Sequence, residues 1–337
     1  MKAVWFENRE ITLTAAPVPE PGKNEALVKV LMAGICATDT EIYQGYAEFS
    51  GIAGHEFVGV VRKAPAHTGL VGKRVVADIN CGCGKCAWCR CGDPRHCEAR
   101  RVIGIRGRNG AFAEYISVPA QNLHVVPETV ETLRAVFAEP LAAALEITQQ
   151  AHITNSMRIL VLGDGKLGLL CALALKHFSS RVMLAGRHTE KLAIAGNQGI
   201  DTLHTAEGGI RQSAFRRTGR FDMVVEATGS PTGIREALEL VRPEGTVIVK
   251  TTSHSPSQID LSTVTVNEIH LLGSRCGDID LALRFLENNR VDVLPLVEKI
   301  YSISGFTGAF AHAAKKGSLK VLIDPTQSGE SAAFSVE

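Results

Sequence analysis

Six of the nine cysteines fall between Cys81 and Cys97. Four of them, Cys83, Cys86, Cys89 and Cys97, follow the spacing C-x2-C-x2-C-x7-C. Four thiolates at such spacing can close a tetrahedron around one metal ion and leave no open coordination position, which is typical of a structural zinc site. The same spacing also suits an iron–sulfur cluster, and disulfide bonds are a third alternative.

A second set of potential metal ligands is spread along the chain. It consists of Cys36 in "GICATD", His55 and Glu56 in "GHEF", and Glu139 in "FAEP". A thiolate, an imidazole and a carboxylate form the mixed donor set of a catalytic zinc, which keeps one position for water or substrate. Each residue also has a plain structural interpretation: Cys36 as a small apolar side chain, His55 as a hydrogen-bonded core histidine, Glu139 as a helix cap. Spacing alone does not bring them together.

The segment "VLGDGKLG" contains Gly163-x-Gly165-x-x-Gly168 between an expected strand and an expected helix. In a dinucleotide-binding loop, Gly163 permits the tight turn, Gly165 admits the pyrophosphate, and Gly168 lets helix and strand pack closely. The helix start at Lys166 and Leu167 then presents free N–H groups to the phosphates. The alternative is an ordinary strand–turn–helix.

The next strand ends in "VMLAGRH", where an NAD site usually carries an acidic residue for the ribose 2′-hydroxyl. Here Gly186 stands at that position, followed by Arg187 and His188, with Lys191 one turn on. Glycine would leave room for a 2′-phosphate and arginine would pair with it, so this segment predicts a preference for NADP(H). The alternative is that Arg187 is a solvated surface charge.

Composition narrows the class of protein. The chain has 337 residues with 36 Lys and Arg against 35 Asp and Glu, which argues against a nucleic-acid binder that relies on bulk charge. The start resembles no signal peptide, and the most apolar window, residues 159–178, carries Asp164, Lys166 and Lys176. We therefore expect a cytoplasmic protein without membrane or nucleic-acid partners, in which clustered cysteines bind metal more often than they form disulfides.

Two patterns of secondary structure follow one another. Short strands are predicted at residues 25–36, 57–64, 72–79, 111–118 and 123–127. After Pro140, strands at 157–163, 181–186, 221–228, 245–250 and 268–274 alternate with helical segments, which predicts a parallel, doubly wound sheet. A helix over 278–289, strands near 296–303 and 319–324, and a loose tail over 325–337 complete the chain.

Taken together, the motifs resemble those of the zinc-dependent medium-chain dehydrogenases, which act on alcohols, polyols and glucose. The shared stretches, in family order, are "GICATD", "GHEFVGVV", "GKRVV", the four-cysteine run, "GAFAEY", "VLGDGKLG", "VEATG" and "KVLI". The resemblance implies an α/β protein with a GroES-like, β-rich catalytic domain over 1–140 and 277–337 and a Rossmann domain over 141–276. It implies catalytic zinc at Cys36, His55 and a carboxylate, with Glu56 beside it.

The resemblance also assigns roles to individual positions. Asp39 would orient the zinc histidine, and Glu139 stands where the polyol, threonine and glucose branches have glutamate. Cofactor contacts are implied for four further residues: Thr228, then Thr251 and Arg275 near the nicotinamide, and Lys320 at the pyrophosphate. Two positions depart from the family: Ala37 replaces a phosphate-binding arginine of some relatives, and Glu41 replaces a proton-relaying histidine.

The expected function is hydride transfer between NADP(H), or NAD(H), and a secondary alcohol, polyol or sugar hydroxyl. Thr38, two residues after Cys36, would take the hydroxyl proton and pass it on, and Glu41 would either relay it to solvent or only lie at the edge of the cleft. Two zinc ions per chain and a homodimer or homotetramer are expected. The rival interpretations are a non-catalytic NADP(H)-binding sensor or structural protein, and a zinc-independent enone or quinone reductase on the same scaffold.

Overall fold

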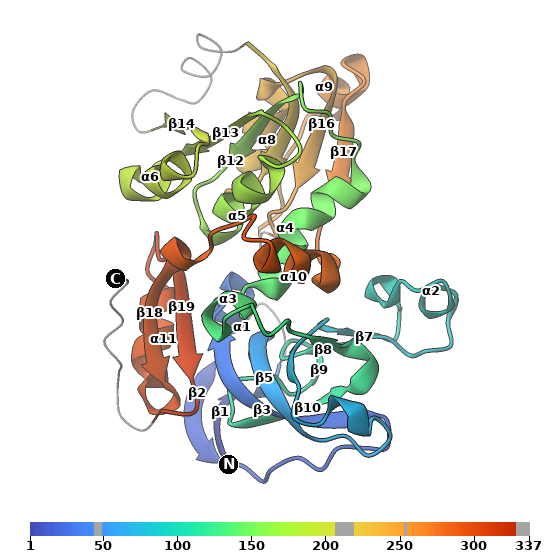
Figure 1. Cartoon of the computed structure of the whole chain (residues 1–337). Coiled ribbons are helices and arrows are strands. Elements are labelled where there is room, and N and C mark those ends of the chain that lie inside the picture. Colours follow the sequence, from blue (N-terminus) through green and yellow to red (C-terminus); the bar gives the residue numbers. More distant parts are fainter. Residues whose placement is uncertain (44–48, 206–218, 253–254, 328–337) are drawn as a thin grey trace. The chain divides into compact units, whose positions relative to one another are not determined.

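The structure is a computed structural model that describes residues 1–43, 49–205, 219–252 and 255–327. The chain divides into two compact units (Figure 1). The first comprises residues 1–139, 279–288 and 296–337, and the second comprises residues 140–278 and 289–295. Most of the loose tail predicted for 325–337 lies outside the described residues.

The first unit is built on a sheet whose central strand is β3 (Glu25–Gly34). Alternate side chains of β3 are buried, as expected for a strand that places one face on the core. Strand β5 (Glu56–Lys63) pairs with β3 antiparallel along one side, and β10 (Tyr115–Pro119) and β19 (Lys320–Asp324) pair with it antiparallel along the other. The sheet continues through β6 (Arg74–Ala77) to β11 (Leu123–Val125), and through β19 to β18 (Val297–Ser302).

Two smaller sheets complete the strands described in the first unit. One contains β1 (Lys2–Glu7), β2 (Glu10–Ala15) and β4 (Gly51–Ile52), and the other contains β7 (Asn80–Cys81), β8 (Arg101–Ile103) and β9 (Gly107–Arg108). The β1–β2 hairpin turns at Asn8 and Arg9, both with positive φ, as a two-residue hairpin loop requires. This hairpin was not among the strands predicted from the sequence, because its turn lacks the usual glycine.

The helices of the first unit are short. Three of them precede the second unit along the chain: α1 (Ala37–Tyr43), α2 (Ala87–Arg90) and α3 (Thr132–Ala135). Two more follow it: α10 (Ile279–Glu287) and α11 (Phe306–Ala313). Short 3-10 helices occur at residues 68–70, 94–96, 120–122 and 303–305. Helix α10 is tied to this unit by a hydrogen bond from Arg134 to the carbonyl of Leu286 at 2.9 Å.

The second unit contains a six-stranded parallel sheet of order β14-β13-β12-β15-β16-β17, which confirms the predicted doubly wound fold. Its strands are β12 (Arg158–Leu162), β13 (Arg181–Gly186), β14 (Asp201–His204), β15 (Phe221–Glu226), β16 (Val241–Val249) and β17 (His270–Gly273). Helix α5 (Lys166–Leu175) packs on β12 and β13, α6 (Thr189–Asn197) on β13 and β14, and α8 (Gly233–Leu240) on β15 and β16. Helices α4 (Ala138–Gln150) and α9 (Leu261–Val266) and a 3-10 helix at 294–296 complete its described elements.

One boundary differs from the prediction. The segment 289–295, predicted to belong to the catalytic domain, belongs to the second unit. Two side chains of that unit hold it: His177 Nε2 lies 2.5 Å from the carbonyl oxygen of Arg290, and Gln198 donates to the carbonyl of Asp292 at 3.0 Å. Within the described ranges, no helix has both the length and the apolar character needed to cross a membrane.

Candidate active site and structural metal centre

Cys36, His55 and Glu56 meet at one end of the main sheet of the first unit. Cys36 follows β3, and His55 and Glu56 lie at the start of β5, where Gly34 pairs with Glu56. The antiparallel register therefore joins two segments that the sequence separates. One ligand atom of each residue lies within 4.8 Å of the other two, and His55 and Glu56 are buried. The three side chains can bind one metal ion together.

Asp39, in the first turn of α1, organises this cluster. Its carboxylate accepts the backbone N–H of Cys36 at 2.8 Å and lies 3.4 Å from Nδ1 of His55. Burial alone would lower the pKa of His55, but the negative charges of Asp39 and Cys36 outweigh it and the pKa is raised well above its ordinary value. Because Asp39 faces Nδ1, the other ring nitrogen of His55 is available to a metal, the arrangement found around zinc histidines.

Lys320 forms an ion pair with Glu56 directly over Gly34. Glu56 begins β5 and Lys320 begins β19, the two strands that flank the end of β3. A Cβ atom at Gly34 would lie 2.5 Å from Oε2 of Glu56 and 3.4 Å from Cδ of Lys320, so glycine makes room for the pair. Burial would lower the pKa of Lys320, but Glu56 and Cys36 raise it. Its predicted contact with cofactor pyrophosphate stays a prediction.

Glu139 lies in the first turn of α4, close enough to interact electrostatically with His55, Glu56 and Lys320. Removal of its carboxyl group from water raises the pKa of Glu139 to about 7, and the negative charge of Glu56 contributes in the same direction. Its carboxylate is not among the groups that lie within 4.8 Å of one another, so its role as a ligand stays a prediction.

Two residues of α1 were assigned to proton transfer. The Thr38 hydroxyl lies 3.8 Å from Sγ of Cys36, which places it beside the ligand cluster. Glu41 lies on the same helix, one turn after Ala37, and its relay role stays a prediction.

The donor set fits zinc. Thiolate sulfur, imidazole nitrogen and carboxylate oxygen are the three ligand types that catalytic zinc sites use. A buried imidazole whose far nitrogen faces a carboxylate is the usual support for such a ligand. Asp39 Oδ1 and His55 Nδ1 are both buried without a hydrogen bond in the described part of the chain. Positive charge at this cluster would offset the buried negative groups.

The four cysteines of the opening motif also come together. Cys83, Cys86, Cys89 and Cys97 each offer a sulfur within 4.8 Å of the other three, on the excursion between β7 and β8 that carries α2 (Figure 1). A Cβ atom at Gly82 would lie 2.6 Å from Sγ of Cys89, so the backbone passes close to the cluster. Hydrogen bonds from the backbone of Lys85 and Cys86 lower the pKa of Cys83 to about 6. That favours the thiolate a metal needs.

All nine cysteines, which lie in the described ranges, are free, so the disulfide alternative gains no support. Cys81 and Cys91 lie outside the four-sulfur group. Burial raises the pKa of Cys81 to about 11, which keeps it a thiol. Cys91 is exposed and its sulfur lies 3.2 Å from the carbonyl oxygen of Trp88.

The glycine-rich loop of the second unit has the backbone that its sequence predicts. Gly163 has φ of +106°, a conformation that favours glycine. A Cβ atom at Gly168 would lie 1.9 Å from the carbonyl oxygen of Gly163, whereas a Cβ atom at Gly165, at the start of α5, would meet no described residue within 4 Å other than its chain neighbours. The N-terminal end of the helix that begins at Lys166 and Leu167 therefore lies beside backbone that a phosphate group could approach.

The end of β13 differs from the expectation. Gly186 does not leave open room: a Cβ atom there would lie 2.3 Å from Cβ and Oδ2 of Asp164. Arg187 is exposed, His188 is half-buried and Lys191 is buried in α6. A carboxylate from the glycine-rich loop therefore occupies the space beside Gly186, and the preference for NADP(H) drawn from Gly186 and Arg187 stays a prediction.

Glu226, which the sequence reasoning did not single out, organises the ends of β15 and β16. One of its carboxylate oxygens accepts the N–H and hydroxyl of Thr228 at 2.9 and 2.6 Å and the hydroxyl of Thr251 at 2.9 Å. Arg275 follows β17, and its carbonyl accepts from Lys250 at 3.2 Å. The glutamate of "VEATG" was the available signal. The cofactor roles of Thr228, Thr251 and Arg275 stay predictions.

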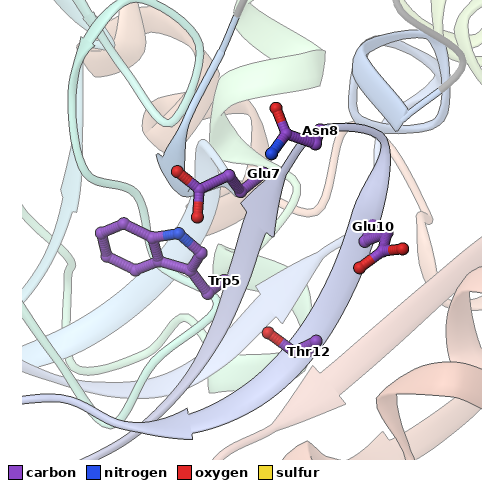
Figure 2. A pocket seen from close by; sticks show the side chains of 5 residues that line it. All are labelled: Trp5, Glu7, Asn8, Glu10 and Thr12. Carbon is purple, nitrogen blue, oxygen red and sulfur yellow. The ribbon is translucent and has the colours of Figure 1, made fainter.

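A surface hollow of about 180 Å³ lies on the β1–β2 hairpin (Figure 2). Its lining residues are Trp5, Glu7, Asn8, Glu10 and Thr12. None of them was a predicted site residue, and we assign no function to the hollow.

Comparison with known proteins agrees with this picture. The family model of the alcohol dehydrogenase GroES-like domain matches residues 22–128, and the family model of zinc-binding dehydrogenases matches residues 167–288. Sorbitol dehydrogenase of Halalkalibacterium halodurans is 31% identical, over 92% of this chain and 94% of its own length.

Two solved structures have a fold similar to that of this chain. An alcohol dehydrogenase of Escherichia coli CFT073 complexed with NADH is 27% identical with a TM-score of 0.90, covering 96% of this chain and 99% of that one. A zinc-binding dehydrogenase of Sinorhizobium meliloti 1021 bound to NADP is 28% identical with a TM-score of 0.87, at the same coverage.

The fold and sites thus define a nicotinamide-dependent dehydrogenase with a GroES-like domain and a Rossmann domain. The chain belongs to the zinc-type medium-chain dehydrogenase family, as its motifs predicted.

Proposed function

We propose that this protein is a zinc-dependent oxidoreductase that interconverts a polyol or secondary alcohol and its carbonyl compound with a nicotinamide dinucleotide. The observation that carries the proposal is the cluster of Cys36, His55 and Glu56, whose ligand atoms lie within 4.8 Å of one another. A zinc ion held there would supply Lewis-acid polarisation of the substrate oxygen.

The residues around the cluster have separable tasks. Asp39 fixes the His55 ring through contacts to Nδ1 and to the backbone of Cys36. Lys320 holds the Glu56 carboxylate in place. The hydroxyl of Thr38, next to Cys36, accepts the substrate proton and passes it toward solvent, with Glu41 on the same helix as an alternative relay.

A polyol is the preferred substrate class. Glu139 stands where the polyol-oxidising branches of the family carry glutamate, and sorbitol dehydrogenase is among the similar proteins. We further propose two zinc ions per chain, the second at Cys83, Cys86, Cys89 and Cys97, where four sulfurs exclude substrate and the ion only stabilises the fold. Assembly into a homodimer or homotetramer remains part of the proposal.

The rival functions are weaker. A non-catalytic cofactor-binding protein would need neither the buried Cys36–His55–Glu56 cluster nor Thr38 beside it. A zinc-independent enone or quinone reductase would not need the four-cysteine site. Metal content separates the three, since only the proposed enzyme is expected to hold zinc at both sites and to need the ion at Cys36, His55 and Glu56 for turnover.

The test is a screen of sugar alcohols, secondary monoalcohols and aldoses with NAD⁺ and NADP⁺ in parallel, following the absorbance of the reduced cofactor. We expect turnover of at least one sugar alcohol and about two zinc ions per chain. Cys36→Ser should lose one zinc equivalent and nearly all turnover, while Cys91→Ser, the exposed cysteine outside both clusters, should keep both. Thr38→Ala should lose about 100-fold or more in kcat. Full turnover by Cys36→Ser would refute the proposal.

A further inference from the structure

Asp164, between the first two glycines of the dinucleotide loop, reaches across to the end of β13. Its Oδ2 accepts the backbone N–H of Arg187 at 2.6 Å and that of His188 at 2.7 Å. Nδ1 of His188 lies 3.0 Å from the same oxygen. These contacts lie within the second unit and hold the carboxylate in one position.

That position is the one a strand-end side chain would occupy. A Cβ atom built on Gly186 would lie 2.3 Å from Oδ2 and 2.4 Å from Cγ of Asp164. In dinucleotide-binding sheets, a carboxylate at the end of the second strand binds the 2′-hydroxyl of the adenosine ribose. Here the carboxylate arrives from the glycine-rich loop instead. Gly186 is needed because the two side chains could not share the space.

The carboxylate is charged. Burial of Asp164 would raise its pKa, but the hydrogen bonds from His188 and Arg187 outweigh that effect and hold the pKa below its usual value. Its Oδ2 accepts two backbone N–H groups and lies 3.0 Å from Nδ1 of His188, whereas the one polar contact of Oδ1 among the described residues is that same Nδ1, at 3.1 Å. A carboxylate has about four acceptor sites, so Oδ1 can also accept a hydroxyl. It would repel a phosphate group at the same point.

We propose that Asp164 sets the choice of cofactor: it accepts the 2′-hydroxyl of the adenosine ribose and repels a 2′-phosphate, so the protein favours NAD(H) over NADP(H). This rests on the proposed use of a nicotinamide dinucleotide. It reverses the preference that Gly186 and Arg187 predicted from the sequence, because that prediction assumed an empty space at the strand end.

The test is direct titration of the zinc-loaded protein with NADH and with NADPH, following the fluorescence of the reduced nicotinamide, so that no alcohol substrate is needed. We expect NADH to bind more tightly by about tenfold or more, since a like-charge contact costs several kcal/mol. Asp164→Asn keeps the shape and removes the charge, so it should bind NADPH about tenfold more tightly than the wild type does. Asp164→Ser should also weaken NADH by several-fold, because it removes the acceptor.

A reciprocal variant separates cofactor choice from loop anchoring. Gly186→Asp in the Asp164→Ser background returns a carboxylate to the strand end and should restore the NADH preference. If Asp164 only ties the loop to β13, Asp164→Ser and Asp164→Asn will weaken both cofactors equally, and the inference is overturned. Tighter NADPH binding by the wild type would overturn it too, yet leave the proposed function intact. Binding of neither cofactor would refute both.

Discussion

Replacing Lys320 with methionine tests the ion pair at the centre of the candidate active site. Lys320 is 2% exposed and Glu56 is 1% exposed, so the change leaves a carboxylate buried without its ammonium partner. Cys36 and Glu139 interact with Lys320 as further negative groups. Removing one member of a buried ion pair typically costs about 3–5 kcal/mol. We expect about 3 kcal/mol for the zinc-loaded protein, because the bound cation offsets part of the charge.

The assay is urea unfolding followed by tryptophan emission. The two tryptophans, Trp5 and Trp88, both belong to the first unit, so the signal reports the unit that contains the ion pair. Lys320→Met should lower the urea midpoint and leave the slope unchanged, since the surface exposed on unfolding stays the same.

A second variant makes the reasoning refutable. Glu56→Gln combined with Lys320→Met removes both charges of the ion pair and should be about 2 kcal/mol more stable than Lys320→Met alone, because the Glu56 carboxylate is no longer buried without its partner. A double variant no more stable than Lys320→Met would contradict a stabilising role of the ion pair. So would a loss of less than about 1 kcal/mol in the free energy of unfolding of Lys320→Met.

Three further outcomes are expected. Gly34→Ala places a methyl 2.5 Å from Oε2 of Glu56 and should cost about 1–3 kcal/mol in the same urea assay, whereas Gly69→Ala, with no atom within 4 Å, should change stability by less than about 0.5 kcal/mol; equal effects would contradict the packing argument. Cys97→Ser should lose one of about two zinc equivalents, measured by atomic emission, while Cys91→Ser loses none; a full metal complement in Cys97→Ser would exclude the four-sulfur site. Glu25 is half-buried, which opposes its ionisation, but hydrogen bonds from Arg108, Gly22 and Ser117 lower its pKa below 4.5. Its stabilisation is therefore present above pH 4.5 and lost as the pH falls through the lower folded-state pKa, so Glu25→Gln should cost about 1–2 kcal/mol near neutral pH and nearly nothing at about pH 3; a gap that does not change with pH would show that the charge is irrelevant.

Features that are local in the sequence were predictable without a structure. The four cysteines of the second metal site lie on one short excursion, so their spacing already limits how far apart the sulfurs can be. The glycine-rich loop is equally local. Gly163 is needed for its positive φ, and Gly168 is needed because a Cβ atom there would meet the carbonyl oxygen of Gly163, a residue of the same strand–turn–helix segment. The alternation of strands and helices after Pro140 likewise predicted the parallel sheet.

Features that depend on strand pairing were not. Cys36 and His55 meet only because β3 and β5 pair in one register, which a single sequence does not reveal and which the family resemblance supplied. The Lys320–Glu56 pair depends on β19 taking its place beside β3. The position of the Asp164 side chain could not be predicted for a similar reason. Its direction is set by the backbone N–H groups of Arg187 and His188, which directly follow another strand, β13.

The place of β19 also bears on the order in which the protein can be completed during synthesis. Most of the first unit precedes the second unit along the chain, yet its main sheet lacks β18 and β19 until residues 297–324 have been made. The sheet of the second unit, by contrast, comes from one continuous stretch, 158–273. It can form while the first unit still lacks β18 and β19. Domains generally fold as units when their last segment emerges. Until Lys320 has been made, Glu56 has no cation from β19 beside it, so the candidate active site takes its final form only after the whole second unit and β19 have been translated.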